Sequence, residues 1–166
     1  MTRRFETKFG SLDHYDKGAV EVIDDEAKHY TFSNIFEVAS RSRPYEKVAV
    51  GQNRQYVLEA VRAEGTSGWR TASHDEFALV MDGEVEVRLR QLAEGQQASA
   101  EVEGSIAVDG EPGALMGRVR AGRGHMTLLP AGAAYQFHAD RPSVILMQTI
   151  GGRDTVYKWA EIIQMS

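Results

Sequence analysis

Short segments rich in β-branched and aromatic residues follow one another through most of the chain, and turn-forming residues separate them. β-Branched and aromatic side chains favour strands, whereas Gly, Pro and Asp favour the turns between strands. Many short strands with frequent turns are typical of antiparallel sandwiches and barrels, so the sequence predicts an all-β fold. The segments predicted as strands are 30–39, 55–62, 76–81, 84–92, 125–130, 134–139 and 143–150.

The strongest local pattern is EFALVMDGEVEVRLRQL, residues 76–92. Asp82-Gly83 stands between two apolar-rich runs, and Asp-Gly supplies the positive φ that a two-residue hairpin turn requires. The second run alternates apolar and polar residues, which predicts one dry and one wet face. The first run, FALVM, is almost wholly apolar, as in a strand that is buried on both faces. The pattern therefore predicts a β-hairpin that turns at Asp82-Gly83.

The second half of the chain contains further turns and one change of period. Residues 93–117 are small, polar and rich in glycine, and a second Asp-Gly at 109–110 predicts an inserted hairpin or excursion there. The sequences at 130–132 (Pro-Ala-Gly) and 140–142 (Asp-Arg-Pro) predict turns between the last three strands. Apolar residues at helical spacing within residues 154–165 predict a short amphipathic C-terminal helix.

Size and charge restrict the class of protein. A chain of 166 residues suits a single domain, which we place at 30–166 after a charged N-terminal arm at 1–29. We expect that arm to be solvated, with an arm ordered against a partner as the alternative. The net charge of −5 argues against nucleic-acid binding through bulk charge. No targeting or membrane-spanning segment is visible, so we expect a cytoplasmic protein with no membrane partner.

The residues available for metal binding are few. The chain contains no cysteine, which excludes disulfides, thiolate metal sites and a cysteine nucleophile. A bound metal would need His, Asp, Glu or neutral oxygen ligands. The five histidines are therefore the first candidates, and those at positions 14, 29 and 125 lie in polar or turn contexts where we expect them to be exposed.

Two glycine-containing segments resemble the two motifs of the cupin superfamily. In the first cupin motif a glutamate follows a His-x-His pair and precedes a glycine by seven positions, and Glu76 and Gly83 have this spacing. In the second motif a glycine is followed by five residues and then Pro-x-Gly, which Gly124 and the 130–132 segment match. The resemblance implies a cupin-like jelly-roll barrel, here with a short C-terminal helix.

The metal ligands of the cupin motifs are missing from these segments. The histidine pair would fall four to seven residues before Glu76, where the chain has WRTA at 69–72, and the histidine position of the second motif holds Tyr135. We therefore predict no metal site in this chain. Should an atypical site exist, its ligands would be His74, Glu76, Tyr135 and His138. On a regular strand His138 faces away from Tyr135, which argues against that alternative.

The segment from Asn34 to Leu89, together with 124–139 and the closing WAEI at 159–162, resembles a narrower family. It is similar to the small subunits of two-component hydroquinone 1,2-dioxygenases. The resemblance implies a larger partner subunit that carries Fe(II), with no cofactor in this chain. It implies that the complex cleaves the ring of hydroquinone, a small aromatic diol, with O2 to give 4-hydroxymuconic semialdehyde. The small subunit would stabilise the larger one and add a wall to its substrate pocket.

Three residues are candidates for that wall, and none is expected to be catalytic. Trp69 could stack its ring on an aromatic substrate, Arg70 could pair with a carboxylate, and Tyr135 could donate a hydrogen bond. Each could also serve only in packing or in the subunit interface, where the Arg- and Tyr-containing segment 41–47 is also a candidate. Two alternatives stay open: a stand-alone metal-dependent cupin enzyme and a metal-free binding module for aromatic molecules.

Overall fold

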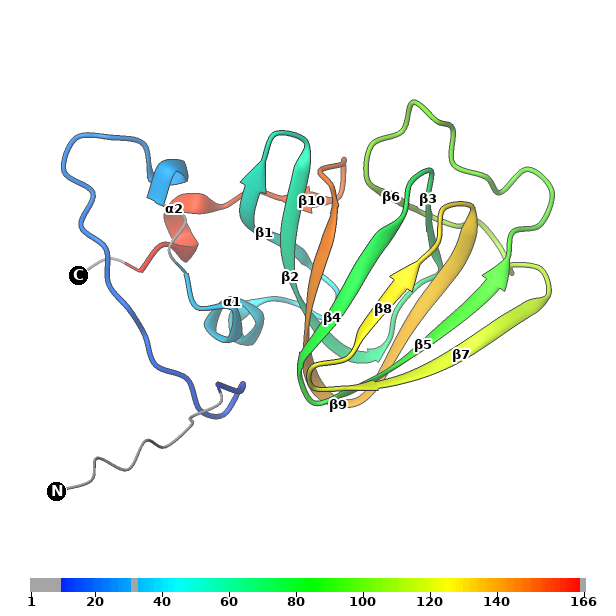
Figure 1. Ribbon diagram of the computed structural model, residues 1–166, viewed down its shortest axis with the longest axis horizontal. Coiled ribbons are helices and arrows are strands. Elements are labelled where there is room, and N and C mark those ends of the chain that lie inside the picture. The colour runs from blue at the N-terminus through cyan, green and yellow to red at the C-terminus, as the bar shows by residue number, and fades with distance from the viewer. Residues whose placement is uncertain (1–9, 31–32, 165–166) are drawn as a thin grey trace, which may run out of the picture.

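A ten-stranded sheet that curls into a barrel forms the body of the computed structural model, which describes residues 10–30 and 33–164 (Figure 1). The predicted all-β barrel with a short C-terminal helix is confirmed. The strands of the described chain are β1 (Lys47–Asn53), β2 (Tyr56–Thr66), β3 (Arg70–Ala72), β4 (Glu76–Asp82), β5 (Glu84–Gln91), β6 (Ser105–Ala107), β7 (Leu115–Gly122), β8 (Met126–Leu129), β9 (Ala133–Ile150) and β10 (Thr155–Val156). The helices are η1 (Ala27–Tyr30), α1 (Ile35–Arg41) and α2 (Trp159–Ile162).

The 18-residue strand β9 organises the barrel. Along one edge it pairs with β2, and along the other it pairs first with β5 and then with β4, all antiparallel. Its inward side chains alternate with outward ones, and the inward set packs with side chains of β2, β4, β5 and β8 in one core. The positions of the candidate functional side chains are therefore determined by β9 and the strands that pair with it.

The predicted hairpin at Asp82-Gly83 is wrong. Strands β4 and β5 pair with β9 and not with each other. The chain therefore bends at Gly83, and β5 continues along the same edge of β9 as β4. Gly83 has a φ of +77°, and a Cβ at this position would lie 2.1 Å from Ser143 Oγ. The positive φ that Asp-Gly supplies thus serves a bend between sheet faces, which uses the same local chemistry as a hairpin turn.

The FALVM segment is not buried on both faces, contrary to the sequence prediction. Its burial alternates, with Ala78 and Val80 buried in the barrel and Phe77 38% exposed on the outside. The turn predicted at 140–142 is also absent, because β9 runs through it without a break. No residue of the neighbouring strands pairs with Pro142. Because proline has no backbone N–H, it fits at such a position without loss of a hydrogen bond between strands.

The strand predicted at 30–39 is wrong as well, since α1 begins at Ile35, while residues 31 and 32 lie outside the described part of the chain. Asn34 caps the helix, and its side-chain oxygen accepts hydrogen bonds from the backbone N–H of Phe36 (2.9 Å) and Glu37 (3.3 Å). Such an N-cap satisfies amides that would otherwise lack a partner. The cap outweighs the β-propensity of the aromatic and branched residues around it.

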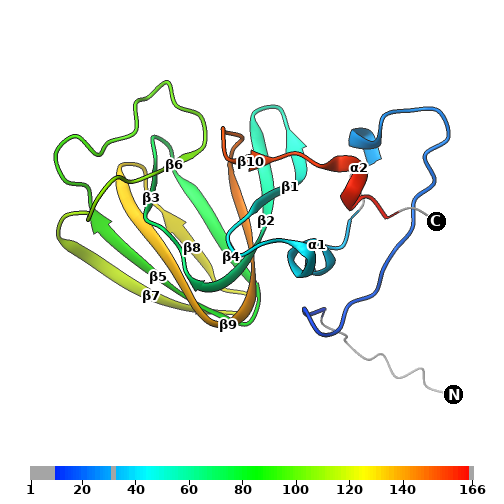
Figure 2. The same cartoon turned by 180° about the vertical axis from the view of Figure 1, so that it is seen from behind.

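The N-terminal arm packs against its own chain from residue 10 onward, whereas residues 1–9 lie outside the described structure. Leu12 and Tyr15 pack against a cluster that contains Phe36 of α1, and Lys17 pairs with Glu37 at 2.8 Å. Figure 2 shows the arm on the side of the molecule that carries α1 and α2. The prediction of a solvated arm is therefore wrong for Leu12, Tyr15 and Lys17, which contact the body of the protein.

The remaining connections largely follow the sequence prediction. The segment around 93–117 is an excursion, but its short strand β6 pairs with β3 rather than forming a hairpin of its own. The C-terminal helix α2 is shorter than the predicted 154–165, because Thr155–Val156 forms β10 in parallel with β1. No helix in the described residues is long and apolar enough to span a membrane.

Candidate functional site

A buried ion pair joins the neighbouring strands β1 and β2. Lys47 Nζ lies 3.3 Å from Glu59 Oε2 and donates to Ser105 Oγ at 2.8 Å. Thr155 of β10 donates to Glu59 Oε1 at 2.6 Å. The Glu59 side chain is fully buried and that of Lys47 is 8% exposed. Side chains of β1, β2, β6 and β10 thus meet at one polar cluster inside the fold.

Arg70 of β3 extends this cluster toward the surface. Its guanidinium donates to Ser105 Oγ at 2.9 Å and to the Ser105 carbonyl at 2.6 Å. It also pairs with Asp154 at 2.7 Å, and the hydrogen bond from Arg70 lowers the pKa of the Asp154 carboxyl against the opposing effect of partial burial. Arg70 and Lys47 border a shallow cleft of about 320 Å³. Arg70 is therefore fixed in place by its own chain at the rim of the barrel.

A second buried polar cluster contains residues from the two cupin-like motifs. Thr149 Oγ1 donates to Glu76 Oε1 at 2.6 Å, and His74 Nε2 lies 3.1 Å from the same Thr149 oxygen. Burial raises the pKa of the Tyr135 hydroxyl well above its ordinary value, and the nearby Glu76 carboxylate raises it further. The Tyr135 hydroxyl lies near both Glu76 and Ser105 without forming a hydrogen bond to either, so it lies between this group and the Lys47 cluster.

These residues do not fit an iron site. A catalytic iron needs three or four inward nitrogen or oxygen ligands from several strands. Within residues 10–30 and 33–164, no three His, Asp or Glu side chains lie together in a way that could hold a metal ion. Tyr135 keeps its proton because its pKa is raised, which makes it a poor ligand. Glu76 Oε2, His74 Nδ1 and the Tyr135 hydroxyl are buried without a hydrogen-bond partner.

His138 lies away from the other three fallback ligands. Tyr135 and Phe137 point into the barrel, whereas His138 points outward, as the strand period predicts. Its ring nitrogens lie 2.7 Å from Thr66 Oγ1 and 3.0 Å from Asp140 Oδ1. The sequence hypothesis of a four-ligand site that includes His138 therefore finds no support in this geometry.

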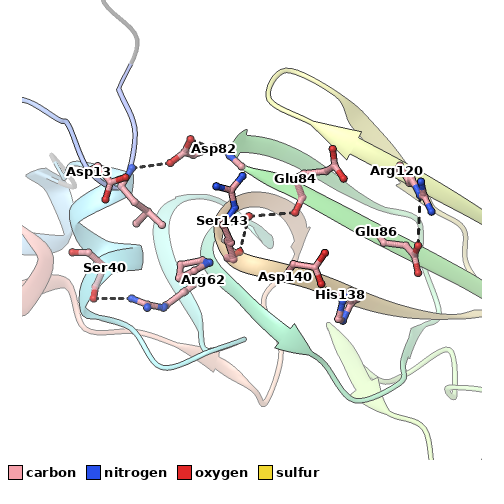
Figure 3. A pocket seen from close by; sticks show the side chains of 14 residues that line it. Asp13, Ser40, Arg62, Asp82, Glu84, Glu86, Arg120, His138, Asp140 and Ser143 are labelled. Atoms are coloured by element: carbon pink, nitrogen blue, oxygen red, sulfur yellow. Dashed lines mark hydrogen bonds and ion pairs between the residues drawn. The ribbon is translucent and has the colours of Figure 1, made fainter.

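His138 instead borders a cleft of about 820 Å³ between the N-terminal arm, α1 and the bend of β9 (Figure 3). Charged side chains line it, but most are already paired. Asp82 accepts from the backbone N–H of Leu12 and pairs with Arg123, and Glu86 pairs with Arg88. The motif residues Glu76 and Tyr135 do not reach this cleft, so its size does not mark it as the site of chemistry.

Trp69 lies half-buried at the start of β3, beside the rim of the barrel. The guanidinium carbon of Arg90 lies 5.5 Å from the centre of its ring, a cation–π contact. Glu111 of the 93–117 excursion pairs with Arg90 at 2.5 Å, and Val108 donates its backbone N–H to the Trp69 carbonyl at 2.9 Å. The excursion thus holds Trp69 in place from two sides.

Sequence reasoning missed Lys47, Glu59, Ser105 and Thr155. One signal was present, since Glu59 interrupts the apolar run YVLEAV at a position where the strand period places an inward side chain. A buried carboxylate needs a partner, so Glu59 implied a cation somewhere in the fold. Lys47 was not identified as that cation because no strand was predicted at 47–53, although β1 and β2 are consecutive strands that pair with each other.

Comparisons with known proteins identify the family of this chain. No protein-family model matches, and no curated protein matches. A solved structure of hydroquinone 1,2-dioxygenase PnpCD, with Cd2+ and 4-hydroxybenzonitrile, contains a chain that is 55% identical, with a TM-score of 0.87 over 98% of this chain and 99% of that one. The chain belongs to the hydroquinone 1,2-dioxygenase family. The enzyme from Sphingomonas sp. TTNP3, solved with 4-hydroxybenzoate bound, gives 51% identity and a TM-score of 0.90 over 98% and 99% of the two chains.

Longer chains of hydroquinone 1,2-dioxygenases share only the fold. A chain from a structure of PnpCD with Fe3+ is 13% identical, with a TM-score of 0.59 over 82% of this chain and 37% of that one. A chain from the Sphingomonas enzyme with 4-nitrophenol is 16% identical, with a TM-score of 0.58 over 85% and 39%. Structures of enzymes in this family thus contain both a chain like this one and a longer chain that includes a barrel of the same fold. The predicted cupin-like barrel and the family resemblance are both confirmed.

Proposed function

We propose that this chain is the small, non-metal-binding subunit of a cytoplasmic hydroquinone 1,2-dioxygenase, and that Fe(II) belongs to a larger partner subunit. The observation that carries the proposal is the likeness, over nearly the full length of both chains, to chains of two such enzymes. The chemistry of His74, Glu76 and Tyr135 supports it, because the first two already contact Thr149 and the pKa of the Tyr135 hydroxyl is raised, so ring cleavage needs a metal site elsewhere.

The proposed reaction consumes one hydroquinone and one O2. The ring bond between a hydroxyl-bearing carbon and its neighbour breaks, and both oxygen atoms enter the product, 4-hydroxymuconic semialdehyde. No external reductant is required, because the four electrons that reduce O2 come from the substrate. The relatives were solved with 4-hydroxybenzonitrile, 4-hydroxybenzoate and 4-nitrophenol, all flat phenols with a polar group at position 4. A phenol-shaped substrate fits this series.

The purified chain should contain no stoichiometric iron and should not turn over hydroquinone. The physical reason is that its inward motif positions supply one carboxylate and one histidine already bound to Thr149. Metal analysis and oxygen uptake of the chain alone, with added Fe(II) or Mn(II), check this, and addition of the larger subunit should bring activity.

About one iron per chain, lost in the double variant His74→Ala/Glu76→Ala, would contradict the proposal and favour a stand-alone cupin enzyme. Saturable binding of phenols by the lone chain, with no association with a larger subunit, would favour a metal-free binding module instead.

The variant Trp69→Ala should lower kcat/KM of the assembled enzyme by about 3- to 10-fold, because a stacked aromatic pair is worth roughly 0.5–1.5 kcal/mol beyond its buried area. We place Trp69, with Arg70 and Tyr135 behind it, in a wall of the substrate pocket. Trp69→Phe is the matched control, since it keeps a flat ring and should retain most activity. Assembly is measured beside turnover by size-exclusion chromatography, and unchanged kinetics in fully assembled Trp69→Ala enzyme would remove Trp69 from the pocket.

A further inference from the structure

The pairing of β3 and β5 with β9 places Trp69 and Arg90 on the outer side of the barrel. Arg70 pairs directly with Tyr135, which points into the barrel, so Trp69 one position earlier faces outward. At the other edge of β9, Leu89 also pairs with Tyr135, so the next residue, Arg90, faces outward too. The two side chains meet there, with the Arg90 guanidinium carbon 5.5 Å from the centre of the Trp69 ring.

Arg90 is itself held by the excursion between β5 and β7. Its Nη1 pairs with Glu111 Oε1 at 2.5 Å and donates to the Pro112 carbonyl at 3.3 Å. The Glu111 side chain is 72% exposed, and an exposed ion pair alone fixes a side chain only weakly. The backbone supports the pair, because the Gly113 N–H donates to the Gln91 carbonyl at 2.8 Å, at the end of β5. The guanidinium therefore lies between a fixed segment and the indole ring.

The same excursion also reaches the backbone of Trp69. Figure 1 shows it looping out beside β3 and β6. The Val108 N–H donates to the Trp69 carbonyl at 2.9 Å, which continues the pairing of β3 with β6. Within residues 108–112, two carbonyl groups accept from the side-chain amide of Gln96, at 2.8 and 3.3 Å. This braced segment thus holds the backbone of Trp69 at one end and, through Arg90, its ring at the other.

We propose that Arg90, held by Glu111, is a positioning residue of the enzyme, which fixes the Trp69 ring at the angle at which it packs on the aromatic substrate. The inference rests on the proposed function, which places Trp69 in the substrate pocket, and it adds what orients that wall. A cation is attracted to the face of an indole ring, so the guanidinium favours one ring orientation. Trp69 is only half-buried, so part of its ring stays open to a flat substrate. Without the cation, the substrate has to order the ring when it binds, which lowers its affinity.

The variant Arg90→Gln should raise KM of the assembled enzyme for hydroquinone by about 2- to 5-fold, the factor that an exposed cation–π contact contributes, and should leave kcat within about 2-fold. Glu111→Gln should act in the same direction but more weakly, because it frees the guanidinium without removing it. Arg88→Gln is the matched control and should leave KM unchanged. Arg88 lies two positions away on the same side of β5, and its guanidinium pairs with Glu86 at 2.6 Å instead of covering a ring.

Two further measurements separate positioning from a merely structural role. In a Trp69→Ala background, Arg90→Gln should change KM by less than about 1.5-fold, because Arg90 acts only through the ring. The substitution Trp159→Phe leaves Trp69 as the one tryptophan of the full chain, so its fluorescence reports on this ring alone. In that chain, Arg90→Gln should raise the quenching constant for acrylamide and lower the fluorescence anisotropy, whereas Arg88→Gln should change neither. Circular dichroism verifies folding, and Arg90→Lys, which lacks the planar fork, replaces Arg90→Gln if that variant does not fold.

The opposite outcomes are equally distinct. An unchanged KM in Arg90→Gln, while Trp69→Ala still impairs the enzyme, would overturn the positioning role and leave the proposed function standing. An equal rise of KM in the Trp69→Ala background would show that Arg90 acts on the substrate directly, and an equal rise in Arg88→Gln would show that only the charge of this side matters; either result overturns the inference. Failure of the unmodified chain to form an active enzyme with the larger subunit would overturn both the proposed function and this inference.

Discussion

Replacing Lys47 by methionine is expected to destabilise the barrel by about 3–5 kcal/mol, because it leaves the fully buried Glu59 carboxylate without its cation. Methionine keeps most of the length of the side chain, so packing changes little. Urea denaturation followed by circular dichroism measures the loss. The double variant Lys47→Met/Glu59→Leu should recover most of it, since removing both charges also removes the unpaired one.

A surface pair supplies the control for Lys47. Arg43 lies 3.8 Å from Glu46 with its side chain 86% exposed, and Arg43→Met should change the free energy of unfolding by less than about 0.5 kcal/mol. A loss in Lys47→Met of under about 1 kcal/mol, or equal losses in the single and double variants, would show that the buried pair is not what stabilises this end of the barrel.

Gly83→Ala should cost about 2–5 kcal/mol of unfolding free energy, combining a left-handed backbone with a steric clash. Its Cβ would approach Ser143 Oγ to 2.1 Å and Ser143 Cβ to 2.8 Å, at a φ of +77°. Gly124→Ala is the matched control, because Gly124 has a φ of +87° and nothing within 4 Å of a built Cβ. It should cost only the backbone contribution, about 1–2 kcal/mol.

A second substitution separates the two contributions at the corner. Ser143→Gly removes the side-chain atoms that the new methyl group meets, so the double variant Gly83→Ala/Ser143→Gly should lose less than the sum of the two single losses. Strict additivity in thermal and urea unfolding would mean that the methyl group does not meet Ser143, and that the corner has opened.

Local patterns predicted the parts of this fold that local chemistry determines. The spacing of Glu76 to Gly83 and of Gly124 to Gly132 resembles the cupin motifs, and this resemblance implied the barrel. Gly83, Gly124 and Gly132 all have a positive φ, a backbone conformation that favours glycine. The cap at Asn34 was also readable, but the aromatic and branched residues around it suggested a strand. The error came from giving propensity more weight than the cap.

The errors at Asp82-Gly83 and at 140–142 have a different origin. Both segments contain turn residues, and both lie at the same corner, where Ser143 of β9 contacts Gly83 beside it. Whether such residues reverse a chain or bend it depends on strand pairing between segments about 60 residues apart, which no local window contains. The Lys47–Glu59 pair was missed for another reason: no strand was predicted at 47–53, although β1 and β2 are consecutive in sequence and pair with each other. The outward position of His138, in contrast, followed from the strand period alone.

The pairing of β9 also has a consequence for how the protein is made. Strands β2, β3, β4 and β5 each pair with β9, and β9 (residues 133–150) follows all of them in sequence. During synthesis each of these strands therefore keeps an unpaired edge until residues 133–150 have left the ribosome. Contacts between segments so distant in sequence make folding slow, and open edges invite pairing with other chains. Closure of the barrel is thus a single late step, and nascent chains that end before residue 133 are expected to aggregate.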